Sequence, residues 1–439
     1  MIKQFARLMV LGILPILILS ACSSAKSAEE YLQDGRTYLE EGDVSKAIGA
    51  LEEALKKEPG LAEAHRLLGE ALGRDARWPE AVKQYEAYLA LVEGDAAARF
   101  LLGQAYIQTG DTRKAAVTFA EGVRGDPDFL TSYQEEIASA ADDFLEAGRD
   151  ALETGDLATA TELLTMVAPL VPGQGDVYIL LGQAHQQSND LMQALSAYGN
   201  AVNLYPELKD AHSDEIDAVA QQGLEMGQVA LEAGDLSTAA QILELTAVLL
   251  SDEPRAHFLL GNVYNQANQF AQAIEQYHVV LSLEPNSSSA HTNMGVVFYK
   301  MGDLQQAVEE FNTALEIEPG DAETHYLLGA AYVQMEQFEP GRAEFETALE
   351  LDDQLSPSYI GLGNVYLLQG DIESALEMAE QAIILSPNSP EAFFLLGQVH
   401  IQLANIAEAR DALEQVLSLN PAPHWRDQAE RLLENLESE

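Results

Sequence analysis

The sequence predicts an all-α solenoid of about eleven helical hairpins closed by a capping helix, and three observations support this fold class. One pattern returns along almost the whole chain, with a usual period of 34 residues. A glycine occupies the eighth position of every copy. Prolines and Gly-Asp pairs recur where helices would have to end. Self-similarity at such a period is typical of repeat proteins, in which each unit buries its apolar face against its neighbours.

The repeat combines a Leu-Gly pair, a Gly-Asp pair seven residues later and then an alanine. Its units begin at residues 28, 62, 96, 141, 175, 220, 254, 288, 322, 356 and 390. Their eighth residues are Gly35, Gly69, Gly103, Gly148, Gly182, Gly227, Gly261, Gly295, Gly329, Gly363 and Gly397. Glycine at its background frequency would not stay in register through every unit.

The small residues predict close packing between two helices in each unit. A glycine inside a helix costs roughly 1 kcal/mol and is kept where a neighbouring helix must approach the backbone. Position 20 also carries a small residue in every unit, and we expect it to face the glycine. The first helix should end at turns such as Gly42-Asp43 and Gly302-Asp303, and the second at the proline that usually fills position 32.

This pattern resembles the tetratricopeptide repeat, whose helical hairpins place small, aromatic and proline residues in the same way. The resemblance covers residues 28–423. It implies a right-handed superhelical solenoid that binds partners in a groove on its concave face. Residues 424–439 carry apolar side chains on one stripe and are predicted to form the capping helix.

Two departures from the pattern are predicted to change individual hairpins. Eleven extra residues, 130–140 and 209–219, precede the first helices of units 4 and 6. Eleven residues make about three helical turns, so we expect two long helices that project from the array. In unit 9, Pro340 and Gly341 lie in the second helix and predict a kinked or weaker hairpin. The repeats therefore form three segments, 28–129, 130–253 and 254–423.

The N-terminal residues predict a lipid anchor. A basic start is followed by the apolar stretch Leu8 to Leu19, which is too short to span a bilayer stably. The next residues, Ser20-Ala21-Cys22, resemble the lipobox of bacterial lipoproteins. This resemblance implies a cleaved signal peptide, 1–21, acylation of Cys22, for example with palmitate, and a lipid-anchored tether, 22–27. An ordinary signal peptide with a chance cysteine is the alternative.

The predicted location is the cell envelope. In Gram-negative lipoprotein families the residue after the acylated cysteine influences sorting, and here it is Ser23 rather than aspartate. The resemblance therefore implies the periplasmic face of the outer membrane in a Gram-negative host. A Gram-positive host would change this expectation.

The net charge of the chain limits the classes of partner that it can bind. Lys and Arg number 23 and Asp and Glu 71, which gives a net charge of −48. Such a field repels nucleic-acid phosphates and anionic lipid headgroups. We therefore expect no nucleic-acid partner, and membrane contact through the lipid anchor alone.

The sequence contains no recognisable catalytic or metal-binding motif, so we expect neither an enzyme nor a cofactor. Histidines are the only candidate ligands. His65, His257, His291 and His325 occupy position 4 of their units, and His185 and His400 occupy position 11. Equivalent positions lie a hairpin apart, too far for one metal ion to bridge. We therefore interpret them as packing residues.

The candidate binding groove follows from helical geometry. Positions 2, 5, 9 and 12 of each first helix share one stripe, which in the resembling family lines the concave face. The last five repeats carry the predicted groove residues Phe258, Asn262, Asn265, Tyr299, Tyr326, Val333, Ile360, Asn364, Leu367, Phe394, Gln398 and Ile401. Aromatic and aliphatic side chains interleaved with amides suit an extended peptide. Burial of these residues against their neighbours is the alternative interpretation.

The sequence thus favours a membrane-anchored scaffold for protein–protein interaction in the bacterial envelope, serving assembly, secretion, exopolysaccharide export or protein sorting. The partner would be an envelope protein or peptide segment. A glycan-binding accessory lipoprotein of a polysaccharide system is the alternative, because aromatic side chains also stack on sugars. A clamp for acidic chain ends is not expected, since basic groove residues are scattered, as with Arg36, Arg66, Arg74, Arg149, Arg255 and Lys300.

Overall fold

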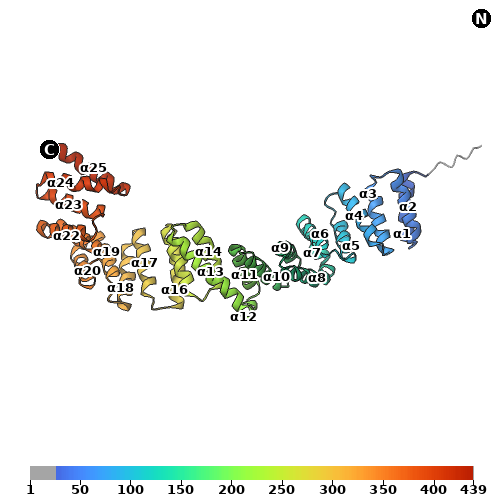
Figure 1. Ribbon diagram of the computed structural model, residues 1–439, viewed down its shortest axis with the longest axis horizontal. Coiled ribbons are helices and arrows are strands. Elements are labelled where there is room, and N and C mark those ends of the chain that lie inside the picture. The colour runs from blue at the N-terminus through green and yellow to red at the C-terminus, as the bar shows by residue number, and fades with distance from the viewer. Residues whose placement is uncertain (1–25, 439) are drawn as a thin grey trace, which may run out of the picture. The chain divides into compact units, whose positions relative to one another are not determined.

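The computed structural model describes residues 26–438, within which all regular structure is helical (Figure 1). Contacts divide the chain into two compact units, one ending at Leu180 and the other beginning at Leu181. The predicted signal peptide, 1–21, and the predicted acylation site, Cys22, lie outside the described residues.

The tether predicted at 22–27 is described only at its last two residues, Lys26 and Ser27. Within residues 26–438, none of the helices combines the length and the apolar character that crossing a bilayer requires.

The first unit consists of antiparallel hairpins in which each helix is followed closely by its partner (Figure 1). The helices are α1 (Ala28–Glu40), α2 (Val44–Lys57), α3 (Ala62–Arg74), α4 (Trp78–Leu91), α5 (Ala96–Gln108), α6 (Thr112–Gly125), α7 (Phe129–Ser132), α8 (Gln134–Glu153) and α9 (Leu157–Val167), followed by the 3-10 turn η1 (Ala168–Leu170). The division between the units falls within α10 (Asp176–Gln187).

The second unit continues the same arrangement to the C-terminus. Its helices are α11 (Leu191–Leu204), α12 (Glu207–Ala211), α13 (Ser213–Glu232), α14 (Leu236–Leu249), α15 (Pro254–Gln266), α16 (Phe270–Leu283), α17 (Ser288–Met301), α18 (Leu304–Ile317), α19 (Ala322–Gln334), α20 (Phe338–Leu351), α21 (Ser356–Gln369), α22 (Ile372–Leu385), α23 (Pro390–Gln402), α24 (Ile406–Ser418) and α25 (Pro423–Ser438). Residues 26–438 therefore contain eleven hairpins and a final helix, which confirms the predicted all-α repeat fold.

The turn inside each hairpin follows the sequence signal. Gly302 takes a left-handed conformation (φ 81°), and the next residue, Asp303, caps α18 by accepting a hydrogen bond from the backbone N–H of Gln306. Ala76 and Asn268 adopt a similar conformation at the same repeat position, both with φ 58°. The turn geometry is therefore kept even where glycine is replaced, because the packing of the two helices fixes it.

The proline at position 32 is not needed to end the second helix. In unit 7, α16 ends at Leu283, two residues before Pro285. In unit 9, which has Asp353 instead, α20 ends at Leu351, the same position of the repeat. The stop is therefore set by the hairpin's geometry, and proline reinforces it.

The glycine at position 8 receives a bulky side chain from the second helix. A Cβ atom on Gly295 would lie 2.6 Å from Cε1 of Phe311, whose side chain is fully buried. Phe311 stands at position 24, and the equivalent residue fills the same place in most other repeats. The small residue at position 20 is also close, since a Cβ atom on Gly397 would lie 3.6 Å from the carbonyl oxygen of Ala409. The predicted close packing is confirmed, and the side chain at position 24 makes closer contact with the glycine than the small residue at position 20 does.

The two predicted long helices are present as α8 and α13, but neither begins where its insertion begins. Each insertion forms a short helix, a break and then a 20-residue helix, with Tyr133 (φ −128°) and His212 (φ −126°) at the breaks. In the first unit, Phe129 is fully buried against Gly122, and the Tyr133 ring lies 3.9 Å from the Phe100 ring. The extra residues pack against α5 and α6 because burying these aromatic rings outweighs continuing the helix.

Pro340 does not break the second helix of unit 9. Pro340 is the third residue of α20, which runs unbroken from Phe338 to Leu351. A proline in the first turn sacrifices no helical hydrogen bond, because the N–H groups there have no partner within the helix.

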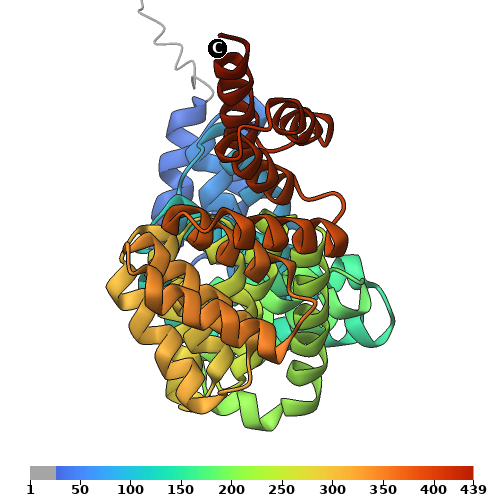
Figure 2. The same ribbon diagram turned by 90° about the vertical axis from the view of Figure 1, so that its left-hand side faces the viewer.

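The predicted capping helix is confirmed as α25. Figure 2 shows this helix, in dark red, lying against the last hairpin at the C-terminal end of the second unit. Its stripe packs onto the core of α23 and α24 through Ala429 and Leu436, which are buried, and through half-buried Trp425. The cap thereby covers apolar surface that the last repeat would otherwise expose.

Candidate binding groove

A pocket of about 530 Å³ lies within the second unit along α17, α19 and α21. The chain builds it from successive first helices, because positions 5, 9 and 12 of each one share a side of the helix. Its lining comprises Tyr299, Tyr326, Ala330, Val333, Gln334, Phe345, Ser356, Pro357, Ile360, Gly361, Asn364, Ser386, Ser389, Glu391 and Trp425.

Five of the twelve predicted groove residues lie together in this pocket. Tyr299 comes from α17, Tyr326 and Val333 from α19, and Ile360 and Asn364 from α21. All five are half-buried, so their side chains are held by the fold but still present surface.

Phe394 is a correction to the predicted groove. Its side chain is only 6% exposed, and its ring lies 5.1 Å from the ring of Trp425. The capping helix covers this position of the last repeat, so Phe394 belongs to the core between α23 and α25. Ile401 packs into the same core, and Leu367 packs into the neighbouring core of α22 and α23.

The predicted residues of repeat 7 make contacts within the fold and do not line the pocket. Asn262 accepts hydrogen bonds from Tyr277 (2.8 Å) and Asn293 (3.0 Å). Asn265, which is 9% exposed, accepts one from Lys300 (2.8 Å).

Two further predicted residues also lie outside the pocket. Phe258 packs beside the ring of Tyr277, with 6.0 Å between the centroids. Gln398 lies half-buried on α23 and is not part of the pocket lining.

The pocket combines aromatic rings with one carboxylate. Burial raises the pKa of Tyr299 and of Tyr326, so both hydroxyls stay protonated at neutral pH and can donate hydrogen bonds. The hydroxyl of Tyr299 and the carboxylates of Glu391 and Glu323 act on Tyr326 in the same direction. No Lys, Arg or His side chain is among the lining residues.

The sequence interpretation missed several lining residues. Glu391 and Pro357 occupy position 2 of their units, a position on the predicted stripe, so this signal was available. Phe345 is the position-24 side chain that packs against Gly329, and it also reaches the pocket. Trp425 comes from the cap, and no pattern within a single repeat indicates that it meets the groove.

Family models match repeats in both compact units of the chain. The model described as TPR repeat matches residues 261–302 and 297–336. Two models described as tetratricopeptide repeat match residues 74–135 and 366–432, and residues 32–76 and 326–390. The chain is a tetratricopeptide repeat protein. As such it is a scaffold for protein–protein interaction.

Solved structures resemble this tetratricopeptide repeat protein at low sequence identity. The Cut9–Hcn1 hetero-tetramer of the APC/C shares 16% identity over 93% of this chain and 96% of that chain, with a TM-score of 0.46. Yeast Tom70 shares 15% over 94% and 96%, with a TM-score of 0.42. PilF of Pseudomonas aeruginosa shares 16% over 49% and 98%, with a TM-score of 0.43. No curated protein matches the chain.

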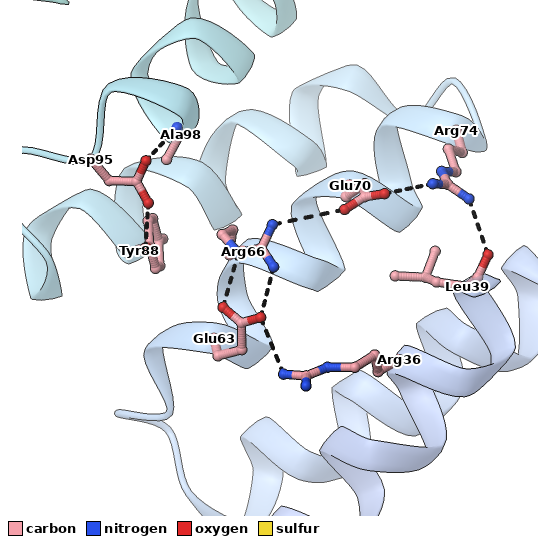
Figure 3. A network of polar contacts seen from close by, with 9 residues as sticks. All are labelled: Arg36, Leu39, Glu63, Arg66, Glu70, Arg74, Tyr88, Asp95 and Ala98. Carbon is pink, nitrogen blue, oxygen red and sulfur yellow. Dashed lines mark hydrogen bonds and ion pairs between the residues drawn. The ribbon is translucent and has the colours of Figure 1, made fainter.

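In the first unit of this tetratricopeptide repeat protein, the corresponding stripe carries an ion-pair network (Figure 3). Arg66 donates to both carboxylate oxygens of Glu63, at 2.7 and 2.9 Å, and Arg36 lies 3.4 Å from the same group. Arg74 donates to Glu70 at 2.6 Å. The hydrogen bond from Arg66 lowers the pKa of Glu63 and keeps it charged.

These pairs concern the basic side chains that a clamp for acidic chain ends would need. Arg36, Arg66 and Arg74 each already face a glutamate of the fold, while Arg255 donates to Gln228 (2.6 Å). Each of these guanidinium groups is thus already engaged by a side chain of the fold. Arg36, Arg66 and Arg74 therefore form ion pairs within the array.

The position-4 histidines join the two helices of a hairpin. His65 and His257 lie 2.8 and 2.9 Å from glutamine side chains of the second helix, and His291 and His325 each lie 2.7 Å from a glutamate there. In the described part of the chain, no group of three or more His, Cys, Asp and Glu side chains is arranged to hold a metal ion.

Proposed function

We propose that this tetratricopeptide repeat protein holds an extended segment of a partner protein in the pocket around Tyr326, as a lipid-anchored scaffold of the bacterial envelope. One observation carries the proposal. Groove residues from three successive first helices, including Tyr299, Tyr326 and Asn364, meet in one pocket of about 530 Å³.

The lining of the pocket suits an extended peptide. Asn364 and Gln334 can pair with a peptide backbone, because an amide side chain both donates and accepts. Ile360, Val333 and the aromatic rings offer apolar surface for alternate side chains of the bound segment.

The anchor is the second part of the proposal. The basic start, the short apolar stretch and the Leu19-to-Cys22 run support acylation of Cys22 after cleavage of residues 1–21. Two or three acyl chains give stable attachment, whereas one gives only marginal binding. The protein would then present its repeats in the envelope, at the periplasmic face of the outer membrane in a Gram-negative host. It would serve an assembly, secretion, exopolysaccharide or protein-sorting system.

The groove is tested by crosslinking in the native host. A photo-crosslinking residue at Gln334, which lines the pocket, should capture a defined partner for mass spectrometry. The same residue at Gln305, an exposed position on α18 outside the pocket, is the control. Capture should be lost in a Tyr326→Ala, Asn364→Ala double variant. Equal capture at both positions, or capture that survives the double variant, would contradict the groove.

The anchor is tested by metabolic labelling with a clickable palmitate analogue. The wild-type chain should be labelled and should fractionate with membranes, and Cys22→Ser should lose both properties. Ser23→Ala should retain the label, since the thiol is the acceptor. Labelling of the Cys22→Ser chain, or no labelling of the wild type, rejects the lipoprotein proposal.

Glycan binding remains the alternative, because Trp425 and Tyr326 expose ring surface in the pocket and sugars stack on such rings. A glycan array probed with the mature chain separates the two proposals. Binding of a defined glycan that Trp425→Ala abolishes, with no protein captured at Gln334, would favour the glycan accessory. We expect no catalytic turnover in either case.

A further inference from the structure

We propose that the Tyr326 pocket selects a partner segment by one arginine side chain, whose guanidinium would pair with Glu391 and stack on the aromatic rings. This inference rests on the proposed function, because it names the chemistry of the segment held in the same pocket. Three features of the pocket support it: a placed carboxylate, a set of rings and the absence of competing cations.

Glu391 is held in place but keeps capacity for a ligand. It lies in the first turn of α23, where a negative charge is favourable, and it is half-buried. The hydroxyl of Ser389, which also lines the pocket, donates to Oε2 of Glu391 at 2.9 Å. Among the described residues, Oε1 has no hydrogen bond. A carboxylate held from one side in this way can accept from an incoming cation on the other.

The rings supply the second part of the recognition. Tyr299, Tyr326 and Trp425, which are half-buried, contribute their rings to the lining. A cation is attracted to the face of an aromatic ring, and a planar guanidinium stacks there better than a compact ammonium does. The pocket therefore favours arginine over lysine.

Electrostatic complementarity selects the sign of the ligand. Glu391 is the only charged side chain in the lining, and Glu323 adds a second negative charge near Tyr326. The chain as a whole has a net charge of −48. An acidic segment would be repelled, whereas a basic one would be attracted over distance and then fixed by Glu391.

A second pocket provides a comparison within the same chain. In the first unit, about 510 Å³ is lined by Trp78 together with Glu135, Glu136 and Asp143. These three carboxylates are all exposed, so water solvates them and weakens any pairing with a cation. The Tyr326 pocket has the better-shielded carboxylate, and the Trp78 pocket defines the rival location in the test.

The test uses the mature chain with Trp78→Phe, which leaves Trp425 as its single tryptophan because the sequence contains two. Blocked pentapeptides Ser-Leu-Xaa-Leu-Ser carry arginine, citrulline or glutamate at Xaa, and binding is followed by Trp425 fluorescence. Citrulline matches arginine in shape but is neutral. We expect arginine to bind about tenfold more tightly than citrulline, and glutamate to bind most weakly.

The matched variants are Glu391→Gln and Glu408→Gln, the second an exposed glutamate on α24 outside the pocket. Glu391→Gln should abolish the preference for arginine over citrulline, while Glu408→Gln should keep it. Both variants should retain the wild-type far-UV circular dichroism.

Three outcomes overturn the inference. Equal binding of arginine and citrulline peptides, both weakened by Tyr326→Ala, rejects the arginine while the groove proposal stands. A preference that survives Glu391→Gln but is lost in Glu135→Gln, Glu136→Gln, with both variants read by isothermal titration calorimetry in the chain that keeps Trp78, moves the cation to the Trp78 pocket. If no peptide changes the fluorescence up to millimolar concentration, the inference fails, and crosslinking at Gln334 then decides separately whether the groove proposal falls with it.

Discussion

The Nδ1 atom of His325 lies 2.7 Å from Oε2 of Glu344, and its Nε2 atom lies 3.1 Å from the carbonyl oxygen of Pro319. One side chain of α19 thus holds both the second helix of its own repeat and the end of the preceding one. His257 repeats the arrangement with Gln276 and the carbonyl of Ser251. Because Glu344 can only accept hydrogen bonds whereas Gln276 can also donate them, the two sites should respond differently to loss of the ring.

We expect His325→Ala to destabilise the α19–α20 hairpin by about 1–3 kcal/mol, because it leaves Glu344 half-buried without its partner. His257→Ala should cost less, since the abandoned group is a neutral amide. Hydrogen exchange read by mass spectrometry should show faster exchange in residues 322–351 for the first variant. An equal loss of hydrogen-exchange protection in the two variants would show that a carboxylate partner stabilises the hairpin no more than an amide partner does.

The glycine at position 8 should be intolerant of even one methyl group. Gly295→Ala should destabilise by about 1–3 kcal/mol, because its Cβ would lie 2.6 Å from Phe311 and the packed hairpin has no space to relax into. Gly49→Ala is the control of opposite sign, since Gly49 is an exposed helical residue with nothing within 4 Å of an added Cβ. It should stabilise by about 0.5–1 kcal/mol. Urea melts of the two variants compare the shifts directly, and a shift of the same sign in both would contradict this packing argument.

The parts of the fold that repeat could be predicted, and those that do not repeat could not. A register such as Gly295 with Asp303 recurs unit after unit, so local propensity and packing agree and the hairpins follow from the sequence. The helix is interrupted at Tyr133 because Phe129 and Tyr133 pack against aromatic side chains of α5 and α6. The helical periodicity of the sequence does not indicate such tertiary contacts.

The same distinction applies to the binding site. The shared helical side of positions 2, 5, 9 and 12 correctly predicted that Tyr326, Ile360 and Asn364 lie in one pocket, because these residues occupy stripe positions in successive first helices. It failed at Phe394, where the array stops and the cap packs on the position that would have been groove. Trp425 lines the pocket from the cap, and its register against the last repeat is set by packing that no repeat pattern records.

Removing the cap's largest side chain should loosen the end of the array and leave its beginning unchanged. Trp425→Ala deletes the ring beside Phe394, and we expect a loss of about 2–3 kcal/mol because the tryptophan is only half-buried. Repeat arrays couple mainly to nearest neighbours, so faster hydrogen exchange should be confined to residues 390–438. Uniform loss of protection through α1 and α2 would contradict this local coupling.

Asp95 should make the junction between α4 and α5 sensitive to acid. Its Oδ2 atom accepts from the Tyr88 hydroxyl at 2.6 Å and its Oδ1 atom from the backbone N–H of Ala98 at 3.0 Å (Figure 3). Burial alone would raise the pKa of Asp95, but hydrogen bonds from Tyr88 and from the backbone N–H groups outweigh it, so the pKa lies below its usual 3.8. The stabilisation is therefore complete above the unfolded-state pKa and is lost as the pH falls through the lower folded-state pKa.

Asp95→Asn keeps the shape of this contact and removes its charge. At pH 7 we expect it to lower the free energy of unfolding by on the order of 0.5 kcal/mol after solvent screening. The difference from the wild type should shrink towards zero as the pH falls through the lowered pKa of Asp95, because the carboxyl group is then itself protonated. At high pH the contact depends on the Tyr88 hydroxyl staying protonated. The hydrogen bond to Asp95 raises the pKa of Tyr88 to about 12, so the contact persists until strongly alkaline pH. Thermal melts of both chains between pH 2.5 and 7 check the acid limb, and a difference that grows as the pH falls would show that the carboxylate is not stabilised by these donors.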